Sequence, residues 1–229
     1  MSSPEMDRAQ RSQALRERLD SGGVNSPLLS GPVSTQSTPE VTTRTFGGTL
    51  KRGAKTFAAI LGTLGAVSAL NFLMSGALYQ FGLIPRTSSG AWGILFHPLL
   101  HLNAAHLAVN SVGIVVIGGT VFLRSERDFW RVTALGVLVG GSATWLLGRT
   151  SLHIGASGVV FAYLGYLLTT GWFDRKLSSI AISVLAAALW GSVLFGLSPL
   201  QNGISWELHL FGFVGGVVGA WWRKRLSKP

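Results

Sequence analysis

The sequence predicts an all-α membrane protein built as a bundle of six transmembrane helices. Three observations support this fold class. Of the 229 residues, 48% are apolar and only 12% are charged, which is too apolar a balance for an ordinary soluble domain. Six apolar segments approach the roughly 20 residues that a helix needs to cross a bilayer. Lys and Arg gather beside alternate ends of these segments, as they do in the cytoplasmic loops of membrane proteins.

The first 50 residues are expected to form a disordered cytoplasmic tail, and residues 51–229 a single six-helix membrane domain. The tail is rich in Ser, Thr, Gly and Pro and has no apolar period, so one short helix around 8–19 is the only element expected in it. Its first apolar run starts too late for a secretory signal, and its acidic residues argue against a mitochondrial transit peptide.

The six expected membrane helices cover about 56–77, 102–123, 129–147, 153–172, 177–197 and 206–222. The tail, the 124–131 and 175–176 connections and the C-terminus hold nearly all of the Lys and Arg residues. The opposite face carries only Arg86 and Arg149. Because basic residues mark the cytoplasmic side of short loops, both termini are expected in the cytoplasm.

Composition also excludes several kinds of partner and site. A net charge of +10 is compatible with nucleic-acid binding, but the basic residues flank apolar runs, so the expected partner is the lipid bilayer and not nucleic acid. The chain has no cysteine, which excludes a disulfide, a thiolate metal site and a cysteine nucleophile. It has no H-E-x-x-H zinc motif. Asp128 and Asp174 fall in expected cytoplasmic loops, so no metal and no buried aspartate pair is expected.

All five histidines lie where the second, fourth and sixth helices are expected to enter the bilayer from the outer face: His97, His101, His106, His153 and His209. Ser157 and His209 each lie about one turn into their helices, so both are expected at the same depth. Ionisable groups are costly inside a bilayer and usually mark a function.

A seam of small residues is expected to bring Ser157 and His209 together. In the sixth helix Gly212 and Gly216 share the face of His209. The fourth helix offers a counterpart: Gly155, Ser157, Gly158, Ala162 and Gly165. Small residues let membrane helices approach closely, and a nucleophile must lie within hydrogen-bond reach of its base.

Two side chains of the second helix, His106 and Asn110, are placed to donate hydrogen bonds toward the same point. With the backbone N–H of Ser157 near a helix N-terminus, they would stabilise an oxyanion. Each feature also has a structural interpretation. The glycine seam can be packing alone, Ser157 can bond its own i−4 carbonyl, and His106 with Asn110 can be an interhelical clasp. Their joint placement favours chemistry.

Three motifs in this chain resemble those of the rhomboid family. Gly155-Ala156-Ser157-Gly158 is similar to the family's G-x-S-G nucleophile motif, and His209-x-x-Gly212-x-x-x-Gly216 is similar to its sixth-helix motif. The segment His101-x4-His106-x3-Asn110 is similar to its second-helix motif. The three occur in the family's order and on the matching helices.

The resemblance implies a six-helix rhomboid bundle with an active-site cavity that opens outward. It implies an intramembrane serine endopeptidase that uses Ser157 and His209, without a cofactor, to cut transmembrane protein substrates near the outer end of their helix. It also implies that His106 and Asn110 serve the oxyanion and that the Phe161 ring stacks on the imidazole. Six spans without an extra helix resemble the simple prokaryotic form, which implies a multi-pass protein of the cell (inner or plasma) membrane.

Two positions depart from the family pattern. Trp92 is followed by Gly93 where the family often has Arg, and Leu208 precedes His209 where the family usually has a small residue. Glu207 lies two residues before His209 and so projects from another face of the helix, which makes it a poor third member of a triad. The preferred interpretation of Glu207 is a carboxylate that lies at the rim of the cavity or is bonded to a loop.

Two other function classes remain open from the residues. The first is a non-catalytic rhomboid-like protein that binds membrane clients, although such a protein would not need both Ser157 and His209. The second is a haem-binding or transport protein that uses the outer histidines, because His97 and His101 are spaced at i, i+4 and could share a ligand.

Overall fold

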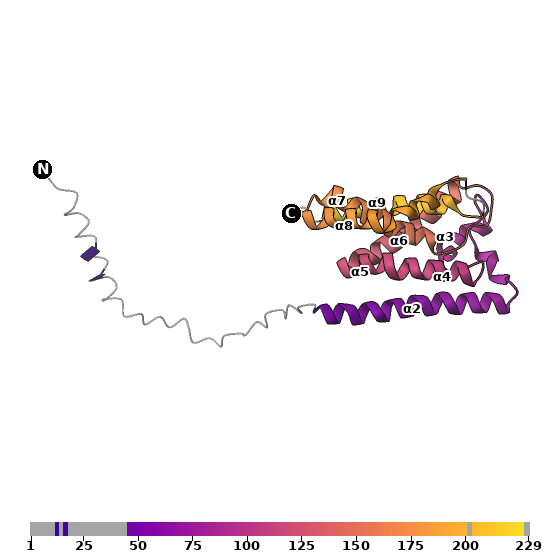
Figure 1. Ribbon diagram of the computed structural model, residues 1–229, viewed down its shortest axis with the longest axis horizontal. Helices are drawn as coiled ribbons and strands as arrows, with labels where there is room; N and C mark the ends of the chain where they lie inside the picture. Colours follow the sequence, from indigo (N-terminus) through magenta and orange to yellow (C-terminus); the bar gives the residue numbers. More distant parts are fainter. Residues whose placement is uncertain (1–11, 14–15, 18–44, 201–202, 227–229) are drawn as a thin grey trace. The chain divides into compact units, whose positions relative to one another are not determined.

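The computed structural model describes residues 12–13, 16–17, 45–200 and 203–226. The described residues from 45 to 226 form one compact unit, which is shown in Figure 1. Most of the expected tail lies outside the described residues, as does most of its short helix around 8–19; the described residues in that stretch, 12–13 and 16–17, are helical. Residues 46–50, which sequence reasoning assigned to the tail, belong to the first long helix.

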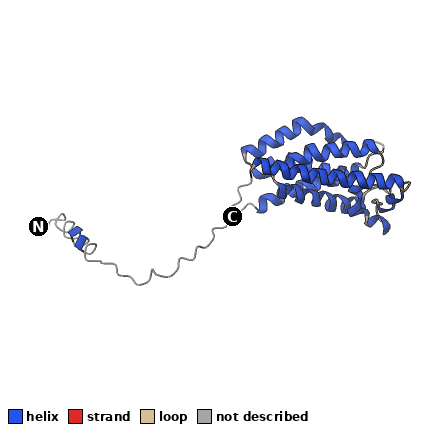
Figure 2. Cartoon of the chain, turned by 90° about the horizontal axis from the view of Figure 1, so that it is seen from below, coloured by secondary structure: helices blue, strands red, loops and turns tan. Residues whose placement is uncertain are grey.

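The compact unit is made of helices, and its described residues contain no strand (Figure 2). The long helices are α2 (Phe46–Leu73), α4 (Ala104–Gly113), α6 (Glu126–Leu147), α7 (Ser157–Asp174), α8 (Leu177–Trp190) and α9 (Trp206–Leu226). A π-helical turn, Ile114–Gly118, joins α4 to α5 (Gly119–Arg124), and a 3₁₀ segment, Gly191–Leu197, extends α8. The connection from α2 to α4 holds α3 (Gly93–Phe96) and three short 3₁₀ turns, Ala77–Phe81, Ser89–Ala91 and His97–Leu99.

Four helices are long and apolar enough to cross a membrane: α2, the continuous helix Ala104–Arg124, α6, and α8 with its extension. The other two long helices, α7 and α9, carry more polar and small residues along their length. They contact each other more extensively than any other described pair of elements (Figure 1). A helix whose face is covered by protein does not need a fully apolar surface.

The first long helix begins and ends earlier than the expected segment 56–77. The Thr45 hydroxyl accepts a hydrogen bond from the Gly48 N–H at 3.2 Å and caps the helix, which then continues past basic residues that hydropathy does not place in a membrane. The chain leaves the helix through Ser75 and Gly76, both with positive φ (51° and 86°). The first and last residues of α2 are therefore set by the local cap and turn, and not by the apolar content of the segment.

The contact between α7 and α9 depends on glycine. A Cβ on Gly212 would lie 2.9 Å from the Gly158 Cα, and a Cβ on Gly216 would collide with the Ala162 carbonyl. Neither position has room for a side chain, so the two backbones pack directly against each other.

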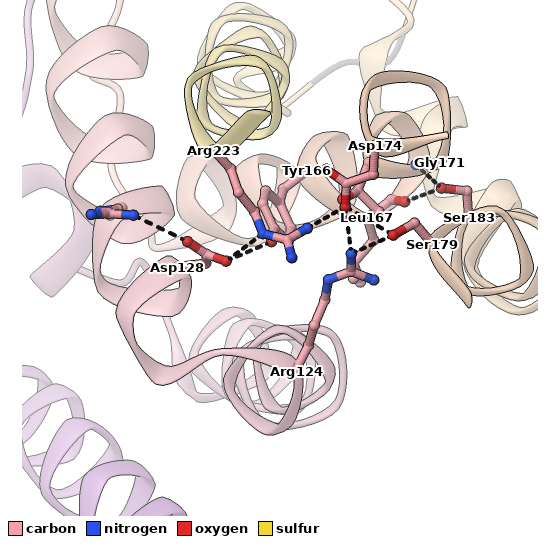
Figure 3. Close-up of polar contacts among 11 residues, drawn as sticks. Arg124, Asp128, Tyr166, Leu167, Gly171, Asp174, Ser179, Ser183 and Arg223 are labelled. Atoms are coloured by element: carbon pink, nitrogen blue, oxygen red, sulfur yellow. Dashed lines mark hydrogen bonds and ion pairs between the residues drawn. The ribbon is translucent and has the colours of Figure 1, made fainter. Parts of the chain in front are cut away.

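An ion network joins the ends of five helices at the opposite end of α7 from Ser157 (Figure 3). Arg223 of α9 pairs with Asp128 of α6 at 3.0 Å and also with Asp174 of α7. Arg124 of α5 pairs with Asp174 at 2.9 Å, and the Ser179 hydroxyl of α8 donates to Asp174 at 2.8 Å. Sequence reasoning was wrong to place both aspartates in loops, because they lie at helix ends, where Asp128 is buried and the side chain of Asp174 is only 8% exposed. Arginine neutralises each carboxylate, so the two do not form an aspartyl pair.

Candidate active site

The centre of the site is a contact between Ser157 and His209. Ser157 is the first residue of α7, not one turn inside it, and His209 lies one turn into α9. The Ser157 Oγ lies 2.8 Å from the His209 Nε2, within hydrogen-bond distance. Ser157 is half-buried, whereas His209 is only 8% exposed. A hydroxyl and an imidazole from two helices therefore meet inside the protein.

The second ring nitrogen of His209 fixes the direction of this bond. The His209 Nδ1 lies 2.9 Å from the carbonyl oxygen of Gly196, in the 3₁₀ extension of α8. A carbonyl oxygen only accepts hydrogen bonds, so the proton of the neutral ring must be on Nδ1. The Nε2 is then free to accept the Ser157 O–H. The backbone of Gly196 thus does what a carboxylate does in a triad.

Phe161 holds the plane of the imidazole. Its ring lies parallel to that of His209, with 4.2 Å between centroids and 11° between planes. Phe161 is one turn after Ser157 on α7 and is buried. The same helix therefore supplies the hydroxyl and the surface against which its partner stacks.

His106 and Asn110 lie close to Gly155, two residues before Ser157. A Cβ on Gly155 would lie 2.7 Å from the His106 Nε2 and 3.6 Å from the Asn110 Nδ2. The His106 Nδ1 accepts the Leu102 N–H at 3.4 Å, so its Nε2 carries the ring proton. One Asn110 Nδ2 hydrogen is donated to the His106 carbonyl at 2.9 Å and the other remains available. The Ser157 N–H, at the first position of α7, has no partner within the helix. The His106 Nε2 and the Asn110 Nδ2 thus both lie near Gly155, two residues before the Ser157 N–H.

Gly155 has a different role from the helix packing expected of it. It lies in the turn before α7 with a φ of +115°, and its N–H donates to the His97 carbonyl at 2.8 Å. Sequence reasoning extended the helical period over 153–156, where the chain is not helical. Glycine is needed there for the positive φ and for the approach of the His106 ring.

The two departures from the family pattern each have a packing reason. Leu208 is fully buried, and a Cβ on Gly158 would lie 3.0 Å from its Cγ, so a large residue on α9 fits a missing side chain on α7. A Cβ on Gly93 would collide with the backbone of Leu83. The loop that carries Trp92 packs too closely there for an arginine.

The loops before α7 and α9 are joined by polar contacts that sequence reasoning did not find. The His153 Nδ1 contacts the Ser205 Oγ, and its Nε2 lies 3.1 Å from the Ser151 Oγ. Burial lowers the pKa of His153, which keeps the ring uncharged at neutral pH. Glu207 accepts the Arg149 N–H at 3.3 Å and pairs with its guanidinium, so it is bonded to a loop and does not reach His209.

The remaining outer histidines do not form a shared site. His97 is fully buried and its Nδ1 donates to the Gly93 carbonyl at 2.8 Å, whereas His101 lines a separate groove. Within the described ranges, no cluster of three or more His, Asp or Glu side chains is placed to hold a metal ion. Neither of the two described cavities includes Ser157 or His209.

Comparisons with known proteins identify the family that this chain resembles. The family model of the Rhomboid domain matches residues 88–225. An uncharacterised protein of Mycobacterium tuberculosis is 35% identical over 178 residues, which is 74% of this chain and 74% of that protein. The rhomboid protease GlpG of Haemophilus influenzae is 27% identical over 172 residues, or 72% of this chain and 84% of GlpG. The rhomboid protease GluP of Bacillus subtilis is 26% identical over 136 residues, or 58% of this chain and 26% of GluP.

Proposed function

Because the chain belongs to the rhomboid family, we propose that it is an intramembrane serine endopeptidase in which Ser157 is the nucleophile and His209 the general base. Membership of the family implies an intramembrane protease, a multi-pass membrane protein whose substrates are themselves membrane proteins. The observation that carries the finer proposal is the 2.8 Å contact between the Ser157 Oγ and the His209 Nε2.

In the proposed reaction His209 removes the Ser157 hydroxyl proton through its Nε2, and the serine oxygen attacks the scissile carbonyl carbon. The resulting oxyanion accepts hydrogen bonds from the Ser157 N–H, the Asn110 Nδ2 and the His106 Nε2. His209 then gives its proton to the departing amine. Water adds to the acyl-enzyme with His209 again as base, which restores the free serine.

Gly196 supports this cycle by accepting the Nδ1 hydrogen of His209 at 2.9 Å. When the ring becomes an imidazolium, the carbonyl dipole faces its positive charge. A dipole stabilises that charge less than a carboxylate does, so turnover is expected to be slow compared with a triad protease.

We also propose that α7 and α9 cross the bilayer together with the four apolar spans, which gives six spans and an active-site cavity that opens to the outer face. The half-buried Ser157 at the start of α7 supports access from that side. An even number of spans puts both termini on one side. The Lys and Arg residues near the start of α2 and the end of α9 favour the cytoplasm. Cleavage is then expected near the outer end of the substrate helix.

The absence of cysteine makes this topology directly testable. We expect a membrane-impermeant maleimide to label a Ser89→Cys variant in intact cells, because Ser89 is exposed in the loop before α4. A Leu226→Cys variant at the end of α9 should label only after lysis. Labelling of both variants in intact cells would contradict the proposed topology.

The catalytic proposal is tested with a single-span reporter protein and the purified full chain in liposomes. Wild type should cleave the reporter and react with a fluorophosphonate at Ser157, whereas Ser157→Ala should do neither. His209→Ala should lower cleavage by about 10⁴-fold or more, because its serine lacks a base. Cleavage at a rate close to that of wild type in either variant would contradict the proposed mechanism.

Ser111→Ala is a matched control for Ser157→Ala. The Ser111 hydroxyl only donates to the Leu107 carbonyl of its own helix, so its loss should leave cleavage unchanged. Folding of each variant is checked by gel filtration. A folded chain without any reporter cleavage or fluorophosphonate reaction would favour the non-catalytic, client-binding alternative.

A further inference from the structure

Two segments lead into the helices that carry the proposed nucleophile and base: residues 148–156 before α7 and residues 203–205 before α9. His153 lies four residues before the proposed nucleophile, and Ser205 lies four residues before the proposed base. The His153 Nδ1 contacts the Ser205 Oγ. A second contact between an imidazole and a hydroxyl therefore joins the two segments, close to the proposed catalytic pair.

The other contacts of His153 establish which atom donates in this bond. Its Nε2 lies 3.1 Å from the Arg149 carbonyl oxygen, which can only accept, so the ring proton is on Nε2. Burial lowers the pKa of His153, so the ring is neutral at neutral pH and its Nδ1 accepts the Ser205 O–H. The Ser205 carbonyl oxygen in turn accepts the His209 N–H at 3.1 Å. Hydrogen bonds thus connect the segment before α7 to the backbone of the proposed base.

Arg149 makes a second connection between the same two segments. The Glu207 carboxylate, in the first turn of α9, accepts the Arg149 N–H at 3.3 Å and pairs with the Arg149 guanidinium at 3.3 Å. The guanidinium also donates to the Ile204 carbonyl. Arg149 and His153 therefore both hold the residues that begin α9.

The backbone that carries His153 is itself held in place. The His153 N–H donates to the Leu83 carbonyl at 2.8 Å, and the Leu83 N–H donates to the His153 carbonyl at 3.1 Å. Two residues later the Gly155 N–H donates to the His97 carbonyl at 2.8 Å. The His153 side chain is buried. The imidazole therefore projects from a fixed backbone and can hold Ser205 at a defined place.

The position of the Ser157 hydroxyl depends on the segment before α7. Ser157 is the first residue of α7, and residues 153–156 before it are not helical. Proton transfer requires the Ser157 Oγ and the His209 Nε2 to lie within hydrogen-bond reach. A misplacement of about 1 Å in such a pair can lower the rate about 10²-fold. Contacts between the two segments therefore affect the distance between the reacting atoms.

We propose that His153 and Ser205 are positioning residues, whose contact sets the distance between the Ser157 hydroxyl and the His209 imidazole. This inference rests on the proposed protease function. It assigns no proton transfer and no nucleophilic step to His153 or Ser205. Loss of their contact should therefore slow the reaction at Ser157 without weakening substrate binding.

The test compares purified full-length variants in liposomes, with the single-span reporter as substrate. Ser205→Ala should lower kcat about 10-fold with KM unchanged, and should slow the reaction of Ser157 with a fluorophosphonate by a similar factor. Ser205→Thr keeps a hydroxyl and should restore both rates. His153→Phe keeps a ring without the Nδ1 acceptor and should match Ser205→Ala. The double variant should show no further loss, because both substitutions remove the same contact.

Ser151→Ala is the matched control. The Ser151 Oγ lies 3.1 Å from the Nε2 of the same imidazole, but Ser151 and His153 belong to the same segment. Its loss leaves the Arg149 carbonyl as the acceptor of the Nε2 proton, so kcat should match that of wild type. Unfolding of each variant in mixed micelles distinguishes a lower kcat from a smaller folded fraction.

Nitrogen NMR of the histidine side chains provides a readout that does not need protease activity. The His153 signals are those that disappear in His153→Phe. Wild type should carry the His153 ring proton on Nε2, and Ser205→Ala should shift the Nδ1 signal. A wild type that neither cleaves the reporter nor reacts with the fluorophosphonate would overturn the proposed function and the positioning role together, while these signals would still report the contact.

Three results would overturn the positioning role alone, in a wild type that cleaves the reporter. The first is a Ser205→Ala variant with the kcat of wild type. The second is an equal loss of kcat in Ser151→Ala, which would show that joining the two segments is not what matters. The third is fluorophosphonate reaction at Ser205 in Ser157→Ala, which would make Ser205 a nucleophile in its own right.

Discussion

The helices in the centre of this bundle differ from those at its edge in what covers them. Residues 158–167 of α7 are all buried, whereas the apolar stretches of α2 and α8 are only 11% and 6% buried. Helices α2 and α8 are long and apolar enough to be recognised as membrane spans by their hydropathy, whereas α7 and α9 are not. Yet α7 and α9 carry Ser157 and His209. Hydropathy thus finds the helices with exposed apolar surfaces, while the proposed nucleophile and base lie on two helices that it does not find.

Among comparisons of two regions, the largest effect is expected between the two faces of α4. Asn110→Ala should lower kcat by about 10²–10³-fold because it removes one of the three proposed oxyanion donors. The buried Asn110 side chain lies near Gly155, while Val109, the preceding residue, is 73% exposed. Val109→Ala is therefore the control, with kcat expected to be unchanged. Equal kcat in the two variants would remove Asn110 from the oxyanion site.

The second contrast is between a buried and an exposed ion pair. Asp174→Asn should reduce the free energy of unfolding by about 3 kcal/mol, because Arg124 and Arg223 lose a buried partner. Arg52→Gln breaks the pair with Glu126, in which the Arg52 side chain is 41% exposed, and should cost about 1 kcal/mol or less. Unfolding in mixed micelles measures both. A larger loss of unfolding free energy for Arg52→Gln than for Asp174→Asn would contradict the prediction that the buried ion pair stabilises the fold more than the exposed one.

The third contrast concerns glycine in the centre and at the edge. Gly212→Ala should destabilise the fold by about 2 kcal/mol, because its Cβ meets the backbone of Gly158. Gly62→Ala has open space around its Cβ and should leave stability unchanged or raise it by about 0.5–1 kcal/mol. The same unfolding assay compares them. Equal free energies of unfolding for Gly212→Ala and Gly62→Ala would mean that the close contact between α7 and α9 does not stabilise the fold.

The smallest expected effect tests the backbone that orients His209. A Cβ on Gly196 would lie 2.8 Å from the Phe161 ring and 3.3 Å from the His209 Nδ1. Gly196→Ala should therefore lower kcat about 10-fold with KM unchanged, a loss of about 1.4 kcal/mol in the transition state only. Gly191→Ala, in the same 3₁₀ segment, has open space and should behave like wild type. A change in KM instead of kcat would assign Gly196 to substrate binding.

The residues that meet at the site could be predicted because their types and spacing stand out in the sequence. Ser157, His209, His106 and Asn110 are polar groups among apolar ones, and the spacing of Gly212 and Gly216 puts small residues on the face of His209. The same period misled at Gly155, because periodicity does not reveal where a helix starts. The start of α2 was missed for a similar reason, since the Thr45 cap is a local hydrogen bond that hydropathy does not detect.

Other parts of the site could not be predicted because no side chain signals them. The acceptor for the His209 Nδ1 is a main-chain carbonyl, which every residue has, so nothing in the sequence distinguishes Gly196. The contact between His153 and Ser205 joins loops 52 positions apart in sequence. Spacing rules describe neighbours on one helix and cannot pair two loops.

The main-chain anchor of His209 has a consequence for how this chain can change. Substitution at Gly196 can crowd the imidazole but cannot delete the oxygen that faces it, so a point mutation in Gly191–Leu197 leaves the hydrogen-bond acceptor of the His209 Nδ1 in the chain. Insertion of one residue into this 3₁₀ segment would instead turn the following carbonyl by about 120° around the helix axis. Among relatives of this chain, length between Trp190 and Gly196 should therefore be restricted more strictly than residue identity.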